Sequence, residues 1–152
     1  MEKRLEINYR HYDSAEEMPD DLRQLVNHAL EALDDAHAPY SHFRVGAAAR
    51  LDNGEILHAA NIESEVFPSG LCAERSLLYY LQSNRRNNRI EALAIASQPS
   101  ERECYPCGGC RQAMVDAERR QRAPFKVVMY GNGTATVVDS AADLVPFTFI
   151  LD

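Results

Sequence analysis

The chain has 152 residues, which suits one globular domain with a buried core. Its composition is 45% hydrophobic and 26% charged, as in ordinary globular proteins, and a net charge of −7 gives a pI near 5.2. An acidic chain lacks the basic surface that binds phosphate backbones, so nucleic acid is not expected as a partner. No window approaches the roughly 18 apolar residues of a membrane span, so no membrane association is expected.

Residues 1–19 are polar and are expected to form an N-terminal extension before a single domain over residues 20–152. The first residues lack the apolar core of a secretory signal, so we expect a cytoplasmic protein. A reducing cytoplasm disfavours disulfides, and metal binding is then the better use of the four cysteines. Apolar residues nearly alternate within the extension and indicate a short edge strand: Leu5, Ile7, Tyr9 and Tyr12.

The next stretch predicts a helix followed by a hairpin. Apolar residues recur at steps of three and four from Asp20 onwards, which indicates an amphipathic helix that ends before Pro39. Residues 43–51 and 56–60 then have the pattern of two strands. We expect a tight turn between them, because the Asn53-Gly54 pair supplies positive φ angles.

The second half alternates helices and strands. A helix is expected to start at Ser69 or Gly70, and another at Gly108. The apolar run from Ala92 to Ser97 is typical of a buried strand that leads into the second cysteine cluster. The sequence therefore predicts an α/β fold, a mixed sheet of about five strands with helices on its faces. Two short segments supply the remaining strands: residues 126–130 and 136–138.

The residues best suited to bind a metal are Cys72 and, later in the chain, Cys107 and Cys110. Three thiolates give Zn²⁺ three soft ligands and leave a fourth tetrahedral position open for water, which is the ligand count of a catalytic site. Glu74 lies two residues beyond the first ligand, where it can move protons without binding the metal. These four residues predict a hydrolytic zinc site.

Cys104 leaves two alternatives open. With Cys107 and Cys110 it forms a C-x2-C-x2-C run, as in iron–sulfur proteins, but the fourth cysteine of the bacterial pattern is absent downstream. All four cysteines could instead form a closed structural zinc site. The position of Glu74 favours the catalytic arrangement, in which Cys104 is a small apolar residue of the loop.

Four segments of the chain resemble the three-cysteine cytidine deaminases of free nucleosides. Two carry the metal and proton chemistry: Cys72–Arg75 (CAER) and Pro106–Gln112 (PCGGCRQ). The others are Tyr40–Ala48 (YSHFRVGAA), similar to the family's Y-S-x-F-x-V-G-A-A, and Asn61–Glu63 (NIE), similar to its ribose-binding N-x-E. The resemblance implies a three-layer α-β-α fold, a Zn²⁺ cofactor, and hydrolytic deamination of cytidine or deoxycytidine with release of ammonia, in pyrimidine salvage.

The resemblance also implies roles for single residues. Glu74 is expected to be the catalytic acid–base group, and Arg75 and Arg111 to hydrogen-bond the thiolates beside them. A homotetramer is implied, in which the C-terminal aromatic residue enters a neighbouring subunit's pocket. The contacts expected with a small nucleoside come from five residues: Phe43 at the base, Asn61 and Glu63 at the ribose, the backbone of Ala73, and Phe149 from the neighbour.

Two departures from the family pattern concern the substrate. Ser64 and Phe67 stand where the family commonly has Asn and Tyr, so the choice among cytidine, deoxycytidine and modified analogues stays open. Another deaminase of the broader superfamily, acting on blasticidin, a nucleotide or a base in nucleic acid, would share the zinc and Glu74. A non-catalytic zinc module would keep the metal without turnover.

Overall fold

The protein is built on one mixed six-stranded sheet, described over residues 1–151 by a computed structural model. The strand order is β1-β6-β5-β4-β2-β3; β4 and β5 run parallel, and the other neighbours are antiparallel. The strands are β1 (Arg10–Tyr12), β2 (Arg44–Leu51), β3 (Ile56–Ala60), β4 (Ile90–Gln98), β5 (Lys126–Gly131) and β6 (Thr134–Val138).

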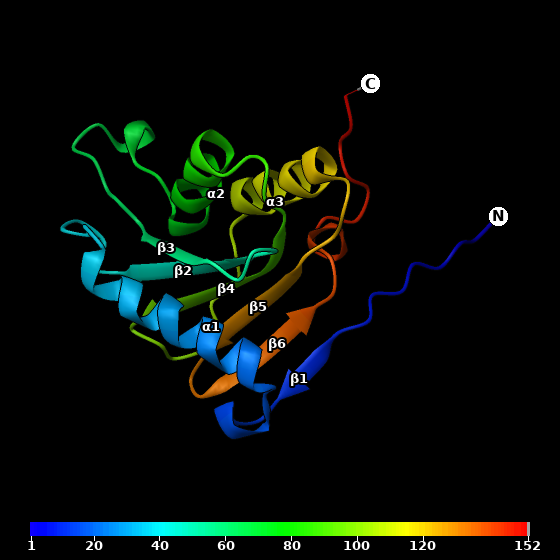
Figure 1. Cartoon of the computed structure of the whole chain (residues 1–152), viewed down its shortest axis with the longest axis horizontal. Helices are drawn as coiled ribbons and strands as arrows, with labels where there is room; N and C mark the ends of the chain where they lie inside the picture. The colour runs from blue at the N-terminus through cyan, green and yellow to red at the C-terminus, as the bar shows by residue number, and fades with distance from the viewer. Residues whose placement is uncertain (152) are drawn as a thin grey trace.

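Three α-helices cover the sheet: α1 (Asp20–Glu31), α2 (Ala73–Asn84) and α3 (Gly108–Gln121). Helix α1 lies on one face, and α2 and α3 lie next to each other on the opposite face (Figure 1). The predicted α-β-α layering of an α/β protein is therefore confirmed. Among residues 1–151, no helix combines the length and the apolar character needed to cross a bilayer.

The sheet has six strands rather than about five, because the N-terminal segment contributes one. Strand β1 pairs antiparallel with β6, with Arg10 opposite Val137. A salt bridge of 2.8 Å between Arg10 and Asp139 lies at the same edge. The expected short edge strand is present only at residues 10–12, so that Tyr12 alone of the four alternating residues lies in it. A domain boundary after residue 19 remains a prediction.

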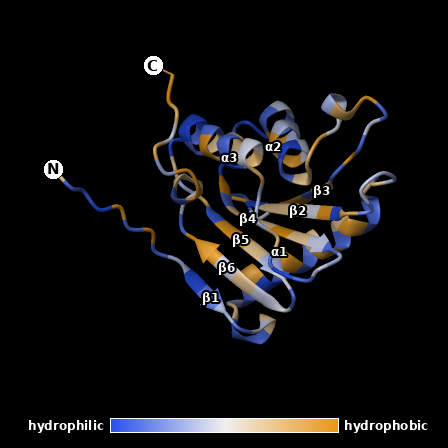
Figure 2. Ribbon diagram, turned by 180° about the vertical axis from the view of Figure 1, so that it is seen from behind, coloured by the Kyte–Doolittle hydropathy of each residue, from blue (hydrophilic) through white to orange (hydrophobic). Residues whose placement is uncertain are grey.

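Helix α1 packs closely on β2 because both surfaces are made of small or aliphatic side chains. Its buried stripe follows the predicted helical spacing: Leu22, Leu25, Val26 and Ala29. A Cβ atom at Gly46 of β2 would lie 2.0 Å from the carbonyl oxygen of Ala29, so only glycine permits this approach. Figure 2 shows the apolar strands enclosed between more polar helices, and the core is divided by the sheet into two layers.

The β2–β3 hairpin is confirmed, but its turn differs from the tight turn that we expected. Only Gly54 of the Asn53-Gly54 pair has a positive φ, +84°, and its N–H donates to the Leu51 carbonyl across 2.9 Å. Four residues, 52–55, connect the strands. This geometry is a turn closed by a left-handed glycine, which needs one positive φ instead of two.

Helix α2 begins at Ala73, later than the predicted start at Ser69 or Gly70. The reason is that Leu71 is held in extended conformation, since it exchanges two backbone hydrogen bonds of 3.0 Å with Ile62. Cys72 is consequently the N-cap of α2 and precedes its first turn. Helix α3 begins at Gly108 as predicted, with Cys107 as its N-cap.

Candidate active site

Three cysteines that are distant in the sequence meet where helices α2 and α3 begin. Cys72 and Cys107 are the two N-caps, and Cys110 lies in the first turn of α3. Their sulfur atoms all lie within 4.8 Å of one another, and among residues 1–151 all cysteines are free of disulfides. The structure thus assembles the three predicted zinc ligands from two separate helix starts.

The spacing of the sulfur atoms fits a zinc ion. Cys72 Sγ lies 3.8 Å from Cys107 Sγ, which lies 3.4 Å from Cys110 Sγ. Tetrahedral zinc with Zn–S bonds of about 2.3 Å requires sulfur–sulfur distances of about 3.8 Å. Cys72, Cys107 and Cys110 are therefore suited to hold Zn²⁺ with one position left for another ligand.

The surroundings favour the thiolate form of Cys72. A hydrogen bond from the Cys110 thiol is the main cause that lowers the pKa of Cys72 to about 5, and a hydrogen bond from Arg75 adds to it. The same contact with Cys72, together with burial, raises the pKa of Cys110. Arg75 donates from Nη2 to Cys72 Sγ across 3.4 Å, as we expected. The positive ends of two helix dipoles also oppose the charge of the thiolates.

Arg111 does not make its expected hydrogen bond to a thiolate. Its guanidinium donates to the carbonyl oxygens of Pro106, at 2.8 Å, and Leu144, at 3.3 Å. The side chain extends from the first turn of α3 back to the loop before Cys107 and to the C-terminal segment. Arg111 therefore fixes the backbone around the second cysteine pair.

Glu74 is buried in the first turn of α2, beside the three thiols. Glu74 is only 3% exposed. Burial raises the pKa of its carboxyl group to about 7, and the charge of Cys72 raises it further. A carboxyl group with a pKa near neutrality can both accept and return a proton, which is what an acid–base catalyst requires.

Cys104 lies near the site but outside the sulfur cluster. Among residues 1–151, the cysteine sulfur atoms that converge are those of Cys72, Cys107 and Cys110 only. Burial raises the pKa of the Cys104 thiol to about 11, and the charge of Glu74 adds to the effect. Because the Cys104 sulfur does not converge with the other three, the structure favours the three-cysteine arrangement over a closed four-cysteine site.

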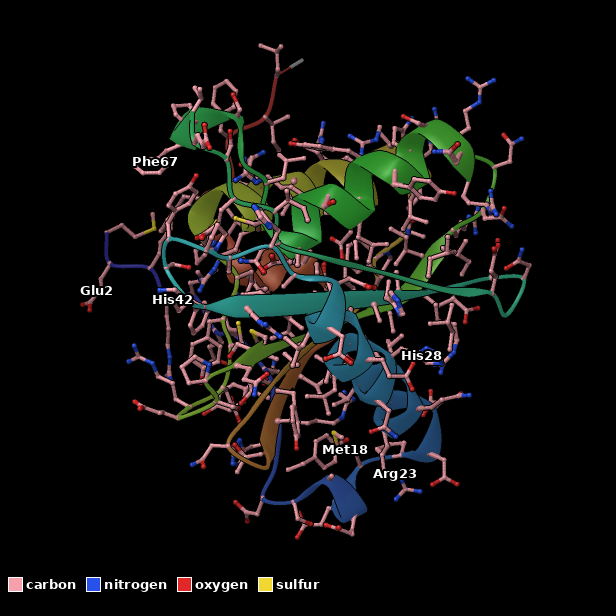
Figure 3. All side chains as sticks on the ribbon, turned by 90° about the vertical axis from the view of Figure 1, so that its left-hand side faces the viewer. Glu2, Met18, Arg23, His28, His42 and Phe67 are labelled. Atoms are coloured by element: carbon pink, nitrogen blue, oxygen red, sulfur yellow. The ribbon has the colours of Figure 1, made fainter. Side chains whose placement is uncertain are left out.

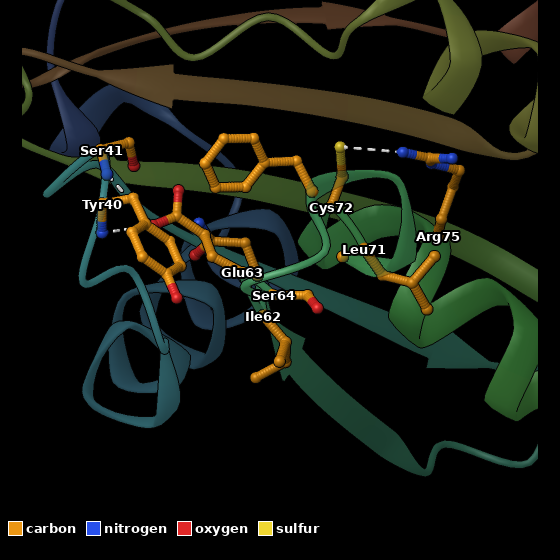
Figure 4. A pocket seen from close by; sticks show the side chains of 11 residues that line it. Tyr40, Ser41, Ile62, Glu63, Ser64, Leu71, Cys72 and Arg75 are labelled. Atoms are coloured by element: carbon orange, nitrogen blue, oxygen red, sulfur yellow. Dashed lines mark hydrogen bonds between the residues drawn. The ribbon is translucent and has the colours of Figure 1, made fainter.

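A pocket of about 570 Å³ opens beside Cys72 and contains the two residues expected at the ribose (Figure 4). Glu63 Oε1 accepts hydrogen bonds from the backbone N–H groups of Tyr40, at 2.9 Å, and Ser41, at 3.1 Å. These contacts hold the carboxylate in place and leave acceptor capacity for a ligand. The pocket is lined by Tyr40, Ser41, Asn61, Ile62, Glu63, Ser64, Phe67, Gly70, Leu71, Cys72 and Arg75.

Tyr40 and Ser41 are among the lining residues that were not predicted as site residues from the sequence. Tyr40 packs edge-on against Phe67 with the ring centroids 5.4 Å apart, and Figure 3 shows Phe67 on a loop that projects from the molecule. The backbone of Tyr40 and Ser41 carries the donors to Glu63. Tyr40 is the first residue of the Tyr40–Ala48 segment that resembles the family. Its backbone contact could not be predicted, because residue types do not show which backbone N–H groups donate to Glu63.

The other predicted contacts lie in different surroundings. Phe43 lines a neighbouring hollow of about 340 Å³ that also includes Cys104. Ala73 is fully buried as the first residue of α2. Phe149 is 73% exposed and therefore does not pack in the core of its own chain. The structure brings Asn61, Glu63 and Cys72 to one pocket and leaves Phe149 outside it.

Three thiols placed to bind zinc and a buried carboxylate lie at the starts of two helices in an α-β-α fold. This arrangement defines a zinc-dependent hydrolase of the deaminase class. The model of the cytidine and deoxycytidylate deaminase zinc-binding region matches residues 19–125. The chain therefore belongs to the cytidine and deoxycytidylate deaminase family.

Named relatives agree with this assignment. The chain is 31% identical to the probable cytidine deaminase of Dictyostelium discoideum, over 86% of this chain and 84% of that protein. It is 36% identical to the cytidine deaminase of Halalkalibacterium halodurans, over 63% of this chain and 71% of the relative. The crystal structure of the Burkholderia pseudomallei cytidine deaminase matches with a TM-score of 0.74 and 32% identity, covering 87% of this chain and 100% of that one.

Proposed function

We propose that the protein is a cytidine deaminase that hydrolyses cytidine or deoxycytidine to uridine or deoxyuridine and ammonia. The observation that carries the proposal is the buried Glu74 beside three thiols whose spacing fits zinc. The family membership and the relatives named cytidine deaminase support the same substrate class.

The chemistry divides between the metal and the chain. Cys72, Cys107 and Cys110 would hold Zn²⁺, which would supply a Lewis acid for the activation of water. Glu74 accepts a proton from the water whose oxygen adds to C4 of the base, and delivers that proton to ring N3. Glu74 then accepts the second proton, from the new C4 hydroxyl, and gives it to the amine. The C4–N bond breaks as the C4 carbonyl forms, so that water and cytidine give uridine and ammonia. The pKa of Glu74 of about 7 suits this exchange near neutral pH.

Recognition of the sugar is assigned to Asn61 and Glu63. Both line the pocket beside Cys72, and Glu63 is held there by two backbone donors. A carboxylate accepts hydrogen bonds from ribose hydroxyls and repels a nearby phosphate, which favours a nucleoside over a nucleotide. Phe43 is proposed to flank the base, and the backbone of Ala73 to accept from its amino group.

The active unit is proposed to be a cytoplasmic homotetramer that acts in pyrimidine salvage. The exposure of Phe149 supports a role outside its own chain, because a large aromatic side chain gains stability when a partner covers it. Neighbouring subunits would then supply walls for an open pocket. The free cysteines suit a reducing compartment, in which thiols remain available to zinc.

The test is ammonia release by the zinc-loaded full chain from cytidine, deoxycytidine, their monophosphates, blasticidin, adenosine and single-stranded DNA. Turnover of free cytidine or deoxycytidine is the expected result. Activity confined to a nucleotide, blasticidin or nucleic acid would assign the chain to another branch of the deaminase superfamily. A full complement of zinc without turnover of any amine would instead identify a structural zinc module.

A further inference from the structure

We propose that His28, Glu31 and His58 form a second metal site, which binds a divalent transition metal such as Zn²⁺ apart from the three cysteines. The site would join the end of helix α1 to the edge strand β3. It takes no part in the proposed deamination, so it stands or fails independently of that function.

The first evidence is the convergence of the ligand atoms. One potential ligand atom from each of the three side chains lies within 4.8 Å of the other two. His28 Nδ1 lies 3.6 Å from Glu31 Oε2, and tetrahedral zinc with bonds of about 2.1 Å places its ligands about 3.4 Å apart. One pair is therefore nearly at the required distance, and Glu31 is exposed and free to adjust.

The folded backbone, rather than chance mobility, brings these residues together. His28 and Glu31 are three residues apart in the last turns of α1, so their side chains share one face of the helix. His58 pairs with Ala48 of β2, and Ala48 belongs to the core layer beneath α1. Opposite residues of antiparallel strands point to the same face, so the register turns His58 towards α1.

A further carboxylate can orient one of the histidines. His58 Nε2 lies 3.5 Å from Asp35 Oδ2, in the short 3-10 helix (Ala32–Asp35) that follows α1. Metal-binding histidines commonly use one ring nitrogen for the metal and direct the other to a carboxylate. The Asp35 contact therefore leaves Nδ1 of His58 for the metal.

The site is open to solvent on one side. The three residues line a hollow of about 560 Å³ between α1, β3 and α2, and Figure 3 shows His28 at the surface of α1. No residue of this hollow also lines the pocket beside Cys72. A ligand set of two imidazoles and one carboxylate suits zinc, copper, nickel or iron, and an open side leaves room for water as a further ligand.

Ordinary surface ion pairs are the alternative, because each histidine already has a carboxylate within 4.0 Å. Two separate pairs would not explain why the two imidazole rings also approach each other, with their centroids 6.4 Å apart. Ion pairs and a metal site differ in a measurable way, since only the metal site binds an additional equivalent of zinc.

The test is equilibrium dialysis of the full chain against Zn²⁺, followed by elemental analysis. We expect two zinc ions per chain in the wild type, and one in His28→Asn and in His58→Asn. Glu31→His should keep both ions because imidazole is a good zinc ligand, and Asp35→Asn should weaken the second ion about 10-fold. His37→Asn, an exposed histidine outside the cluster, is the matched control and should keep both.

Thermal unfolding provides a second measurement that does not depend on activity. Binding of the second ion should raise the Tm of the wild type, because a ligand that binds only the folded chain stabilises it, and His58→Asn should abolish that rise. Circular dichroism and retention of the cysteine-bound zinc establish that each variant is folded. A wild type and a folded His58→Asn that bind the same number of zinc ions would overturn the proposal, whether or not the cysteine site is filled.

Discussion

The side-chain amide of Asn61 donates from Nδ2 to the carbonyl oxygen of Phe43 across 2.9 Å, which joins the end of β3 to the start of β2. Asn61 Oδ1 also accepts from the N–H of Val45 at 2.8 Å. A residue expected to bind ribose thus also fixes the strand that begins beside the predicted base contact. The proposed recognition of the ribose and the local fold would therefore depend on the same amide.

Replacement of Asn61 by alanine should impair both properties. Loss of two hydrogen bonds, each contributing about 0.5–1.5 kcal/mol, should lower the free energy of unfolding by about 1–3 kcal/mol. KM should rise because the pocket loses a polar contact and its anchored wall. Urea unfolding and steady-state kinetics measure the two effects. Asn88→Ala is the control, since Asn88 bonds the exposed Asp52 away from the pocket, and an unchanged KM in Asn61→Ala would contradict the assignment.

Glu74→Gln should retain zinc and fold while kcat falls about 10²–10⁴-fold, because glutamine keeps the shape of the side chain but cannot carry the proton. Elemental analysis measures the zinc content and kinetics measure kcat on the same preparation, so that loss of zinc is distinguished from loss of catalysis. Glu65→Gln, at an exposed position outside the pocket lining, is a suitable control. Near-normal turnover in Glu74→Gln would end the acid–base role.

Cys104→Ala should keep its zinc, whereas alanine at Cys72, Cys107 or Cys110 should cause its loss. The reason is geometric, because only those three sulfur atoms converge among the described residues. Zinc content of the four variants after desalting provides the measurement. Equal zinc loss from Cys104→Ala would instead support the hypothesis of a closed four-cysteine site.

Glu63 should contribute to stability at neutral pH but not in acid. Hydrogen bonds from the Ser41 side chain, and then from backbone N–H groups, lower its pKa from the ordinary value of 4.5. A carboxyl group that binds protons less tightly when folded stabilises the fold above its unfolded pKa, and the contribution is lost as pH falls through the folded pKa. The stability difference between wild type and Glu63→Gln should therefore shrink below about pH 4.

That comparison uses urea unfolding of both proteins, with the same zinc occupancy, at several pH values. The exposed Glu65→Gln is again the matched control and should differ little from the wild type throughout. A difference between wild type and Glu63→Gln that persists unchanged into acid would show that the hydrogen bonds do not favour the ionised carboxylate.

Phe149→Ala should raise KM or weaken assembly without destabilising the fold of the single chain, because Phe149 is 73% exposed. Light scattering at working concentration and kinetics test the two parts. Phe147→Ala removes another exposed aromatic residue, at 96% exposure, and should have the smaller effect on KM. A monomer with full activity would contradict the proposed tetramer.

The sequence by itself determined the chemistry of the site and most of the elements. Local rules were sufficient for these, because the stripe of α1, the β2–β3 hairpin and the start of α3 at Gly108 follow from neighbouring residues. The motif around Cys72 and Glu74 likewise predicts the residues that are proposed to bind zinc and transfer protons, because ligand type and spacing appear directly in the chain.

Tertiary structure decided what depends on residues far apart in the chain. The pairing of Leu71 with Ile62 moved the start of α2, and the carbonyl oxygen of Leu144 drew Arg111 away from the thiolates. Burial, which no single segment specifies, set the raised pKa of Glu74. The meeting of His28 with His58 requires both the packing of α1 and the β2–β3 register, so only the folded chain reveals it.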